Sequence, residues 1–322
     1  MTFAPAAIEI ATEPVPHCPT CDGSRRVPFA CGHDYELETC RNSWRFWQCT
    51  DCTTVWLDPR PAVSTLDTIY PPTYYAYQMD KISPIALKGK ALLDRLKFRS
   101  ILARTGEPAT FVDIGCGDGR YLDLFARRGM PKSQIYGLEL SEKPIVELRK
   151  RGYQAFRRRV EDCVEVPDGA IDLATMFHVI EHVGDPAGVV SKLARWLTPG
   201  GHLVIETPNI DSWDARLFKD RWWGGYHIPR HWTLFQAESL ARLLHAGGLE
   251  VVHVAYQTGH SFWMYSLHHA LKYGGTRRGS AMAPFFDPIR SVLPLAMFTC
   301  FDILRRTLGF KTSTILMIAR KP

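Results

Sequence analysis

The sequence predicts an α/β fold: a doubly wound, mostly parallel sheet preceded by a small N-terminal metal-binding module. Three observations support this. Short apolar runs alternate with helical stretches from Thr110 onwards, the first run leads into a glycine-rich loop, and two Cys-x-x-Cys pairs lie near the N-terminus. The 322 residues are enough for about two domains.

The composition excludes several classes of protein. Hydrophobic residues make up 46% and charged residues 22% of the chain, which excludes an intrinsically disordered protein. A formal net charge of +6 is modest, so neither DNA nor RNA is expected as the main partner. No apolar run reaches the roughly 18 residues of a membrane-spanning helix. The first residues lack the basic start of a secretion signal, so we expect a cytoplasmic location.

The N-terminal cysteines have the spacing of a metal site. Cys18 and Cys21 form one pair, and Cys49 and Cys52 form the other. Each two-residue gap lets both sulfurs of a pair reach one ion, and four thiolates complete a tetrahedron. A closed shell of four thiolates is typical of structural zinc, so these four cysteines are the predicted ligands. A redox Cys-x-x-Cys pair is the alternative.

Four parts are expected along the chain. The Tyr/Pro-rich connector after the zinc module argues for extended structure, and the linker has leucines at helical spacing among lysines and arginines. The predicted parts are 1–80, the zinc module and connector; 81–107, a basic amphipathic linker helix; 108–256, the main domain with an aromatic lid over 208–236; and 257–322, a helical insertion and closing strand.

Six strands can be placed by their short apolar runs, most of which end at a turn signal or a helix start. They are Thr110 to Asp113, Gln134 to Glu139, Tyr153 to Arg157, Ile171 to Phe177, His202 to Thr207 and Thr314 to Ala319. The helix after the fourth strand is the best marked. Asp185 is its predicted cap, Pro186 occupies its first turn, and Pro199 with two glycines stops it.

The first strand leads into a candidate cofactor loop, Asp113-Ile-Gly-Cys-Gly-Asp-Gly119. Glycines there let the backbone approach a ligand at the start of the next helix. Glu139 ends the second strand, where a carboxylate can accept both ribose hydroxyls of an adenosine-containing cofactor. The dinucleotide fingerprint has a third glycine where this chain has Arg120, which argues against NAD.

This loop, followed by an acid at the end of the second strand, resembles that of the class I S-adenosylmethionine-dependent methyltransferases. The segments Phe177-His-Val-Ile-Glu-His-Val183 and Leu197 to Asn209 resemble the fourth and fifth strand regions of quinone-biosynthesis-like members, the methyltransferase domain 23 type. The resemblance covers residues 108 to 256. It implies a seven-stranded Rossmann-like sheet and S-adenosylmethionine as cofactor.

The same resemblance implies eight cofactor-binding residues, in the glycine loop (Asp113, Gly115, Cys116, Gly117), at the ribose (Glu139), near the adenine (Glu161) and beside the sulfonium (Phe177, His178). The segment His178-Val-Ile-Glu-His182 also matches an inverted zinc-protease motif. That motif needs a sustained helix, and Gly184-Asp-Pro interrupts the chain one turn later.

A hydroxyl acceptor would need a nearby imidazole as general base, and His182 and His231 are the candidates. Arg230-His231 with a following Phe resembles a segment of deoxysugar C-methyltransferases, which also carry an N-terminal four-cysteine zinc knuckle. His231 matches their proposed base, while their usual acid is Arg230 here. Tyrosines near Tyr74 and Tyr77 approach the acceptor in those relatives.

The sequence therefore favours a methyltransferase of small molecules, with a hydroxyl of a sugar, glycan or secondary metabolite as acceptor. The basic run 157–159 suits a nucleotide-linked or lipid-linked sugar. A zinc-knuckle RNA methyltransferase and a sugar C-methyltransferase stay open as alternatives. Residues 285–310 allow two interpretations, a peripheral membrane contact or burial against the lid.

Overall fold

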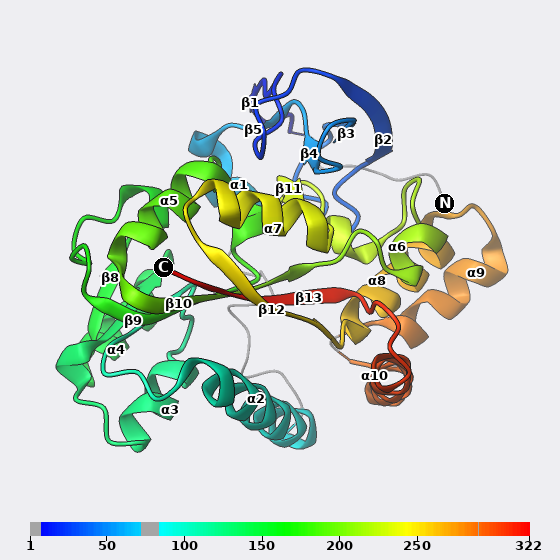
Figure 1. Ribbon diagram of the computed structural model, residues 1–322. Helices are drawn as coiled ribbons and strands as arrows, with labels where there is room; N and C mark the ends of the chain where they lie inside the picture. The colour runs from blue at the N-terminus through cyan, green and yellow to red at the C-terminus, as the bar shows by residue number, and fades with distance from the viewer. Residues whose placement is uncertain (1–7, 72–83, 289) are drawn as a thin grey trace. The chain divides into compact units, whose positions relative to one another are not determined.

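The computed structural model describes residues 8–71, 84–288 and 290–322, which form two compact units (Figure 1). Unit 1 comprises Met1–Lys88, Pro208–Ser239 and Tyr256–Ile315. Unit 2 comprises Gly89–Thr207, Leu240–Ala255 and Leu316–Pro322. Tyr74 and Tyr77, which the resemblance places near the acceptor, lie outside the described residues.

Unit 2 is built on a seven-stranded sheet with the order β12-β13-β10-β9-β6-β7-β8. The five strands from β10 to β8 are mutually parallel, which confirms the predicted doubly wound, mostly parallel sheet. The strands are β6 Phe111–Ile114, β7 Ile135–Glu139, β8 Gln154–Arg157, β9 Ile171–Phe177, β10 Leu197–Pro208, β12 Glu250–Gln257 and β13 Thr314–Arg320. The strand β12 is the one that the sequence pattern did not reveal, since its apolar residues are only partly buried.

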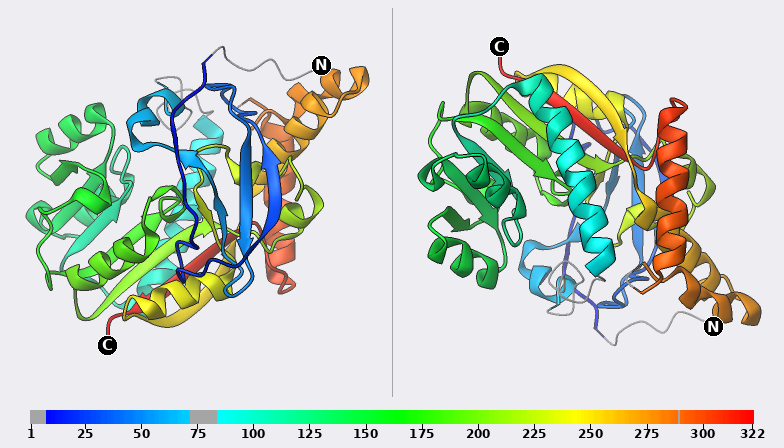
Figure 2. Two further views of the ribbon diagram at one scale, coloured as in Figure 1. Left: turned by 90° about the horizontal axis from the view of Figure 1, so that it is seen from above. Right: turned by 90° about the horizontal axis from the view of Figure 1, so that it is seen from below.

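Helices cover both faces of this sheet. One face carries α2 (Pro84–Thr105), α3 (Arg120–Arg127) and α4 (Glu142–Lys150), and the other carries α5 (Pro186–Trp196) and α7 (Ala237–Ala246) (Figures 1 and 2). On the first face, apolar side chains from all three helices form one buried cluster with the strands.

Local sequence explains which part of α2 packs on the sheet and where α5 begins. In the described part of α2, Phe98 and Ile101 are buried, whereas Leu92 and Leu96 are exposed, so the apolar side toward the sheet begins late in this helix. In α5 the Asp185 carboxylate accepts a hydrogen bond from the backbone of the third helical residue, which is the predicted cap.

Unit 1 joins the N-terminal module to segments from later in the chain. Its four-stranded sheet has the order β11-β4-β3-β2, in which the late strand β11 pairs antiparallel with β4. Its strands are β2 Arg26–Gly32, β3 Trp44–Cys49, β4 Val55–Leu57 and β11 Thr233–Leu234, with β1 Thr12–Glu13 and β5 Arg60–Pro61 as a separate pair. Its helices are α1 Leu66–Ile69, α6 Trp213–Leu217, α8 His260–Tyr273, α9 Arg277–Met282 and α10 Val292–Thr307.

Aromatic residues of the predicted lid segment lie inside unit 1. Trp223, Tyr226 and Trp232 are buried in one cluster with Trp44 and Phe46 of β3. Large aromatic side chains contribute much apolar area to such a core. The segment after β10 and the N-terminal module therefore share a single hydrophobic core.

Short 3-10 helices connect many of these elements. They are η1 Val63–Thr65, η4 Lys132–Gln134, η5 Val160–Asp162, η6 Ile180–His182, η7 Gly224–Tyr226 and η8 Ala283–Phe286. Among the residues described, no helix combines the length and the apolar character that crossing a membrane requires.

Candidate functional site

The glycine loop in unit 2 lies between β6 and α3, at the carboxyl end of the central strand. Gly115 and Gly119 have φ angles of 75° and 80°, in the left-handed region that glycine tolerates best. A Cβ atom on Gly115 would lie 2.5 Å from a methyl carbon of Val179, and one on Gly119 would overlap Leu148. Glycine at both positions therefore avoids these overlaps as well as backbone strain.

The loop and the predicted ribose-binding acid are in direct contact. The backbone N–H of Gly117 donates to Oε2 of Glu139 over 3.1 Å. The other carboxylate oxygen accepts from the backbone N–H groups of Leu140 and Ser141, at 2.7 and 3.0 Å. Because β6 and β7 are parallel neighbours, their carboxyl ends bring these residues together, as the sequence predicts.

Asp113 and Cys116 support the loop from inside the fold. Asp113 is buried and accepts a 2.6 Å hydrogen bond from the Thr175 hydroxyl on β9. Burial raises the pKa of Asp113 to about 7, although this hydrogen bond opposes the increase. Cys116 is also buried and packs against Gly137, where a Cβ atom would lie 2.8 Å from its sulfur.

His178 follows β9 and lies between two carboxylates. Its Nδ1 is 3.2 Å from Glu181 and its Nε2 is 3.5 Å from Glu206. Burial by itself would lower the pKa of His178, but hydrogen bonds and charges from both acids raise it to about 9. His178 has a φ of 54° and lies outside any helix, which excludes the helical zinc-protease interpretation.

Lys97 of α2 completes this charged group, and sequence reasoning missed it. Its Nζ donates to Glu206 over 2.7 Å and lies 4.5 Å from the ring centroid of Phe177. Burial would raise the pKa of Glu206, but the charges of Lys97 and His178 hold it well below its usual range. No local motif reveals this pairing, because the two residues are 109 positions apart.

Arg120, which replaces the third glycine of a dinucleotide loop, has a structural partner. Its guanidinium lies 3.4 Å from the Asp94 carboxylate of α2. The Tyr121 hydroxyl donates to the same carboxylate over 3.0 Å. These contacts attach the linker helix α2 to the start of α3.

Glu161 and His182, the other predicted residues of unit 2, lie on short 3-10 helices. Glu161 in η5 accepts from the backbone N–H of Gly184 over 3.1 Å and pairs with Arg159 at 2.5 Å. His182 ends η6 and is partly buried. The three arginines of the 157–159 run are each paired with an acid: Arg157 with Glu142, Arg158 with Glu165 and Arg159 with Glu161.

The predicted base His231 is buried in unit 1 beside a second histidine. Its Nδ1 donates to the backbone carbonyl of Gly225 over 2.7 Å, which fixes the orientation of the ring. The ring of His227 lies 5.0 Å away, centroid to centroid. His227 Nδ1 lies 2.5 Å from the buried carboxylate of Glu36, which belongs to the N-terminal module.

Glu36 and His227 are functional candidates that sequence reasoning missed. Burial would raise the pKa of Glu36, but the charge of His227 and their hydrogen bond lower it below its usual value. The sequence does contain one signal for His227, namely its position four residues before the predicted base His231. Nothing local indicates Glu36, since its partner follows almost two hundred residues later.

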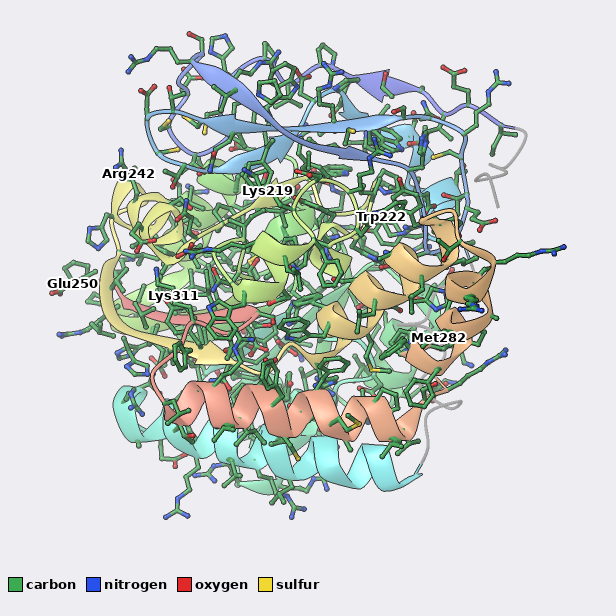
Figure 3. All side chains as sticks on the ribbon, turned by 90° about the vertical axis from the view of Figure 1, so that its right-hand side faces the viewer. Lys219, Trp222, Arg242, Glu250, Met282 and Lys311 are labelled. Atoms are coloured by element: carbon green, nitrogen blue, oxygen red, sulfur yellow. The ribbon has the colours of Figure 1, made fainter. Side chains whose placement is uncertain are left out.

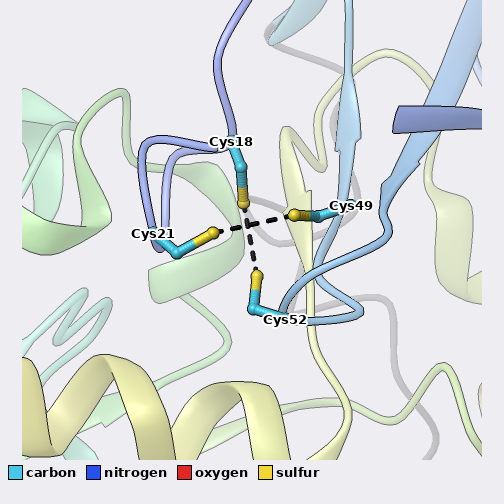
Figure 4. Close-up of side chains that lie close together, drawn as sticks. All are labelled: Cys18, Cys21, Cys49 and Cys52. Atoms are coloured by element: carbon cyan, nitrogen blue, oxygen red, sulfur yellow. Dashed lines mark hydrogen bonds between the residues drawn. The ribbon is translucent and has the colours of Figure 1, made fainter. Parts of the chain in front are cut away.

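The four predicted zinc ligands converge in unit 1 (Figure 4). The Cys18 and Cys52 sulfurs are 3.5 Å apart, and those of Cys21 and Cys49 are 3.6 Å apart. Tetrahedral Zn–S bonds of about 2.3 Å give S–S separations of about 3.8 Å. All four sulfurs lie within 4.8 Å of one another, so the arrangement fits a four-thiolate zinc site.

Comparison with known proteins identifies the protein family of this chain. Residues 85–254 match the model of a methyltransferase domain. A ubiquinone biosynthesis O-methyltransferase from Sodalis glossinidius is 30% identical over 125 residues, which cover 36% of this chain and 49% of that protein. A trans-aconitate 2-methyltransferase from Acidovorax sp. is 34% identical over 125 residues, covering 37% of this chain and 47% of that protein. The matched parts thus span about half the length of these relatives.

Among solved structures, an S-adenosylmethionine-dependent methyltransferase from Mesorhizobium loti has a TM-score of 0.45 and 18% identity, over 69% of this chain and 94% of that chain. The family match itself covers more than half of the present sequence, from the linker helix α2 to β12. It includes the glycine loop and Glu139. The chain therefore belongs to the methyltransferase domain family that the glycine loop and Glu139 led us to expect.

Proposed function

We propose that this chain transfers a methyl group from S-adenosylmethionine to a hydroxyl of a small molecule, such as a sugar, a glycan or a secondary metabolite. The observation that carries the proposal is the hydrogen bond between Gly117 and Glu139, which places a carboxylate beside a glycine loop at the carboxyl ends of β6 and β7. Such a placement suits an adenosine-containing cofactor. The family match supports the same cofactor.

The reaction makes modest demands on the protein. S-adenosylmethionine supplies a methyl group on a positively charged sulfur. An oxygen–carbon bond to the acceptor forms as the sulfur–carbon bond breaks, and the acceptor proton passes to a base. Because charge is dispersed in this displacement, the chain mainly contributes proximity, alignment and exclusion of water.

We assign the proton transfer to His231. The support for this assignment is that the Gly225 carbonyl accepts from Nδ1 and so orients the buried ring, as a general base requires. The ring of His227 lies 5.0 Å from that of His231 and pairs with the Glu36 carboxylate, so both belong to the same buried group. His182 is the competing base, and the two histidines are distinguishable by mutation.

We further propose that Cys18, Cys21, Cys49 and Cys52 bind a structural zinc ion. The sulfur separations and the convergence of four thiolates support this role. Within unit 1 the ion would connect the turn between β3 and β4 to the segment that precedes β2.

Calorimetric titration with S-adenosylmethionine, S-adenosylhomocysteine and NAD tests the cofactor. Binding of the two adenosyl compounds but not of NAD is the expected result, and binding of NAD alone would overturn the proposal. A screen of hydroxylated metabolites, sugar nucleotides and RNA then identifies the acceptor by the mass of the methylated product. Methylation of RNA alone would exclude the small-molecule assignment.

With an acceptor in hand, His231→Gln should lower kcat by about 10²- to 10⁴-fold while leaving the affinity for S-adenosylhomocysteine unchanged. His182→Gln is the matched comparison. A larger loss of kcat in His182→Gln than in His231→Gln would transfer the base assignment to His182.

A further inference from the structure

The outer side of helix α10 in unit 1 carries a stripe of exposed apolar side chains. Leu293, Met297, Leu304 and Leu308 are 63%, 60%, 57% and 65% exposed. They are separated by four, seven and four residues, which places them along one side of a helix, with Leu308 directly after the last residue of α10. Removing such side chains from water lowers the free energy of the protein. A contiguous row that stays exposed therefore indicates a surface that binds a partner.

The inner side of α10 is firmly anchored, so the exposed stripe is not the result of a loosely packed helix. Phe298 stacks on Trp263 of α8 with ring centroids 5.7 Å apart. Asp302 is buried, accepts from the Gly259 backbone over 2.8 Å, and pairs with Arg305 at 3.0 Å. Unit 1 therefore determines which side of α10 faces outward.

The apolar surface continues onto the neighbouring segment α9–η8. Met282 and Phe285 are 56% and 51% exposed, and Figure 3 shows Met282 on α9 together with the side chains that project from α10. We call these six side chains the α10 surface: Met282, Phe285, Leu293, Met297, Leu304 and Leu308.

The segment that carries the α10 surface is rich in arginine. Residues 277–310 contain five arginines and two acids, and the buried pair Asp302–Arg305 removes one of each, which leaves four arginines and one acid. These four arginines, at positions 277, 278, 290 and 306, are exposed. An apolar stripe in a segment with an excess of exposed arginines matches the interface of an anionic bilayer, where hydrocarbon lies beneath negative headgroups.

We propose that the α10 surface rests on an anionic lipid membrane, with α10 lying in the plane of the headgroups. Lying on the membrane is consistent with the lack of a membrane-crossing helix in the described part of the chain. A second copy of the chain is a poorer partner, because a two-fold interface through this surface would bring the same arginines together. This inference is independent of the proposed methyltransferase activity.

Co-sedimentation of the full chain with vesicles tests this inference. The vesicles are phosphatidylcholine alone or phosphatidylcholine with phosphatidylglycerol, each at low and high salt. We expect binding to the anionic vesicles that weakens with salt. The variant Leu293→Asp/Met297→Asp should lower the partition coefficient at least about tenfold, because each carboxylate opposes insertion. The matched control is Val63→Asp/Leu217→Asp, which changes two exposed apolar residues elsewhere in unit 1 and should bind like the wild type.

A local probe links binding to the surface itself. The nine native tryptophans give a common signal. Quenching by bromine-labelled lipids should therefore be greater in Met297→Trp than in the wild type, and Leu217→Trp should not show this increase. The inference is wrong if the wild type does not bind anionic vesicles. It is also wrong if Leu293→Asp/Met297→Asp binds them as well as Val63→Asp/Leu217→Asp does. Salt-resistant dimers that the α10 double variant converts to monomers, without vesicle binding, would instead assign the surface to a second copy.

Discussion

Arg230 and Asp34 form a fully buried, bidentate ion pair across 196 positions of the chain, with N–O distances of 3.0 and 2.9 Å. Burial would raise the pKa of Asp34, but the charge of Arg230 outweighs it and keeps the pKa below its usual value. Arg230 also donates to the backbone carbonyl of Ile69 over 2.7 Å. Arg230 stands where the deoxysugar C-methyltransferases that this segment resembles have an acid, and here it anchors the His231 segment on the N-terminal module.

Removing one member of this pair should destabilise the protein strongly. Arg230→Leu leaves the Asp34 carboxylate buried without its counter-charge, so we expect a loss of about 3–5 kcal/mol in the free energy of unfolding. Urea denaturation measures it. The double variant Asp34→Leu/Arg230→Leu should lose less than the sum of the two single changes, and additive losses would contradict the pairing.

Glu139 should control cofactor affinity. Glu139→Ala removes a carboxylate that lies beside the glycine loop, and hydrogen bonds to a charged group of this kind correspond to about tenfold to hundredfold in affinity. Titration with S-adenosylhomocysteine measures the change. Glu142→Ala, an exposed acid at the start of α4, is the control and should bind normally. Equal affinities in the two variants would remove Glu139 from the cofactor site.

The N-terminal module should depend on its metal. Cys49→Ser removes one of the four thiolates, so we expect loss of zinc, measured by elemental analysis, together with a lower unfolding temperature. Cys31→Ser changes an exposed cysteine outside the cluster and should retain one zinc per chain. Full zinc content in Cys49→Ser would show that the ligand set is wrong.

His178 should make stability depend on pH in a defined direction. Its pKa in the folded chain, about 9, exceeds the unfolded value of about 6.5, so its contribution is complete below the lower value and is lost as the pH rises through the upper one. The destabilisation by His178→Gln should therefore be larger at neutral than at strongly alkaline pH. Denaturant titrations across this range measure it, with exposed His245→Gln as control. A pH-independent difference would contradict the carboxylate pairing.

Most of unit 2 could be predicted because its signals are local. The strand β9 has the predicted bounds, and the Asp185 cap begins α5 as expected. The strand β10 begins five residues before the predicted His202, because Leu197 already pairs with Ile171 of β9, and the register is irregular between Leu197 and His202. The strand β12 escaped because its exposed and half-buried residues give little apolar contrast.

The candidate site was predictable to the extent that its residues lie close in sequence. Gly115, Gly117 and Glu139 follow from the order of strand, loop and strand, because parallel neighbours place their carboxyl ends together. Lys97 and Glu36 were missed. A lysine in a helix or a glutamate in a turn carries no signature until its partner is brought to it by the fold.

The sequence by itself determined the sheet, the glycine loop and the cysteine cluster, since each depends on periodicity or on residue types at short, fixed spacing. Only the tertiary structure decided that β11 extends the N-terminal sheet and that Arg230 reaches Asp34. It also decided that the outer side of α10 is apolar and exposed. The physical reason is that these features depend on contacts between distant segments, and local pattern does not encode which distant surface a side chain will meet.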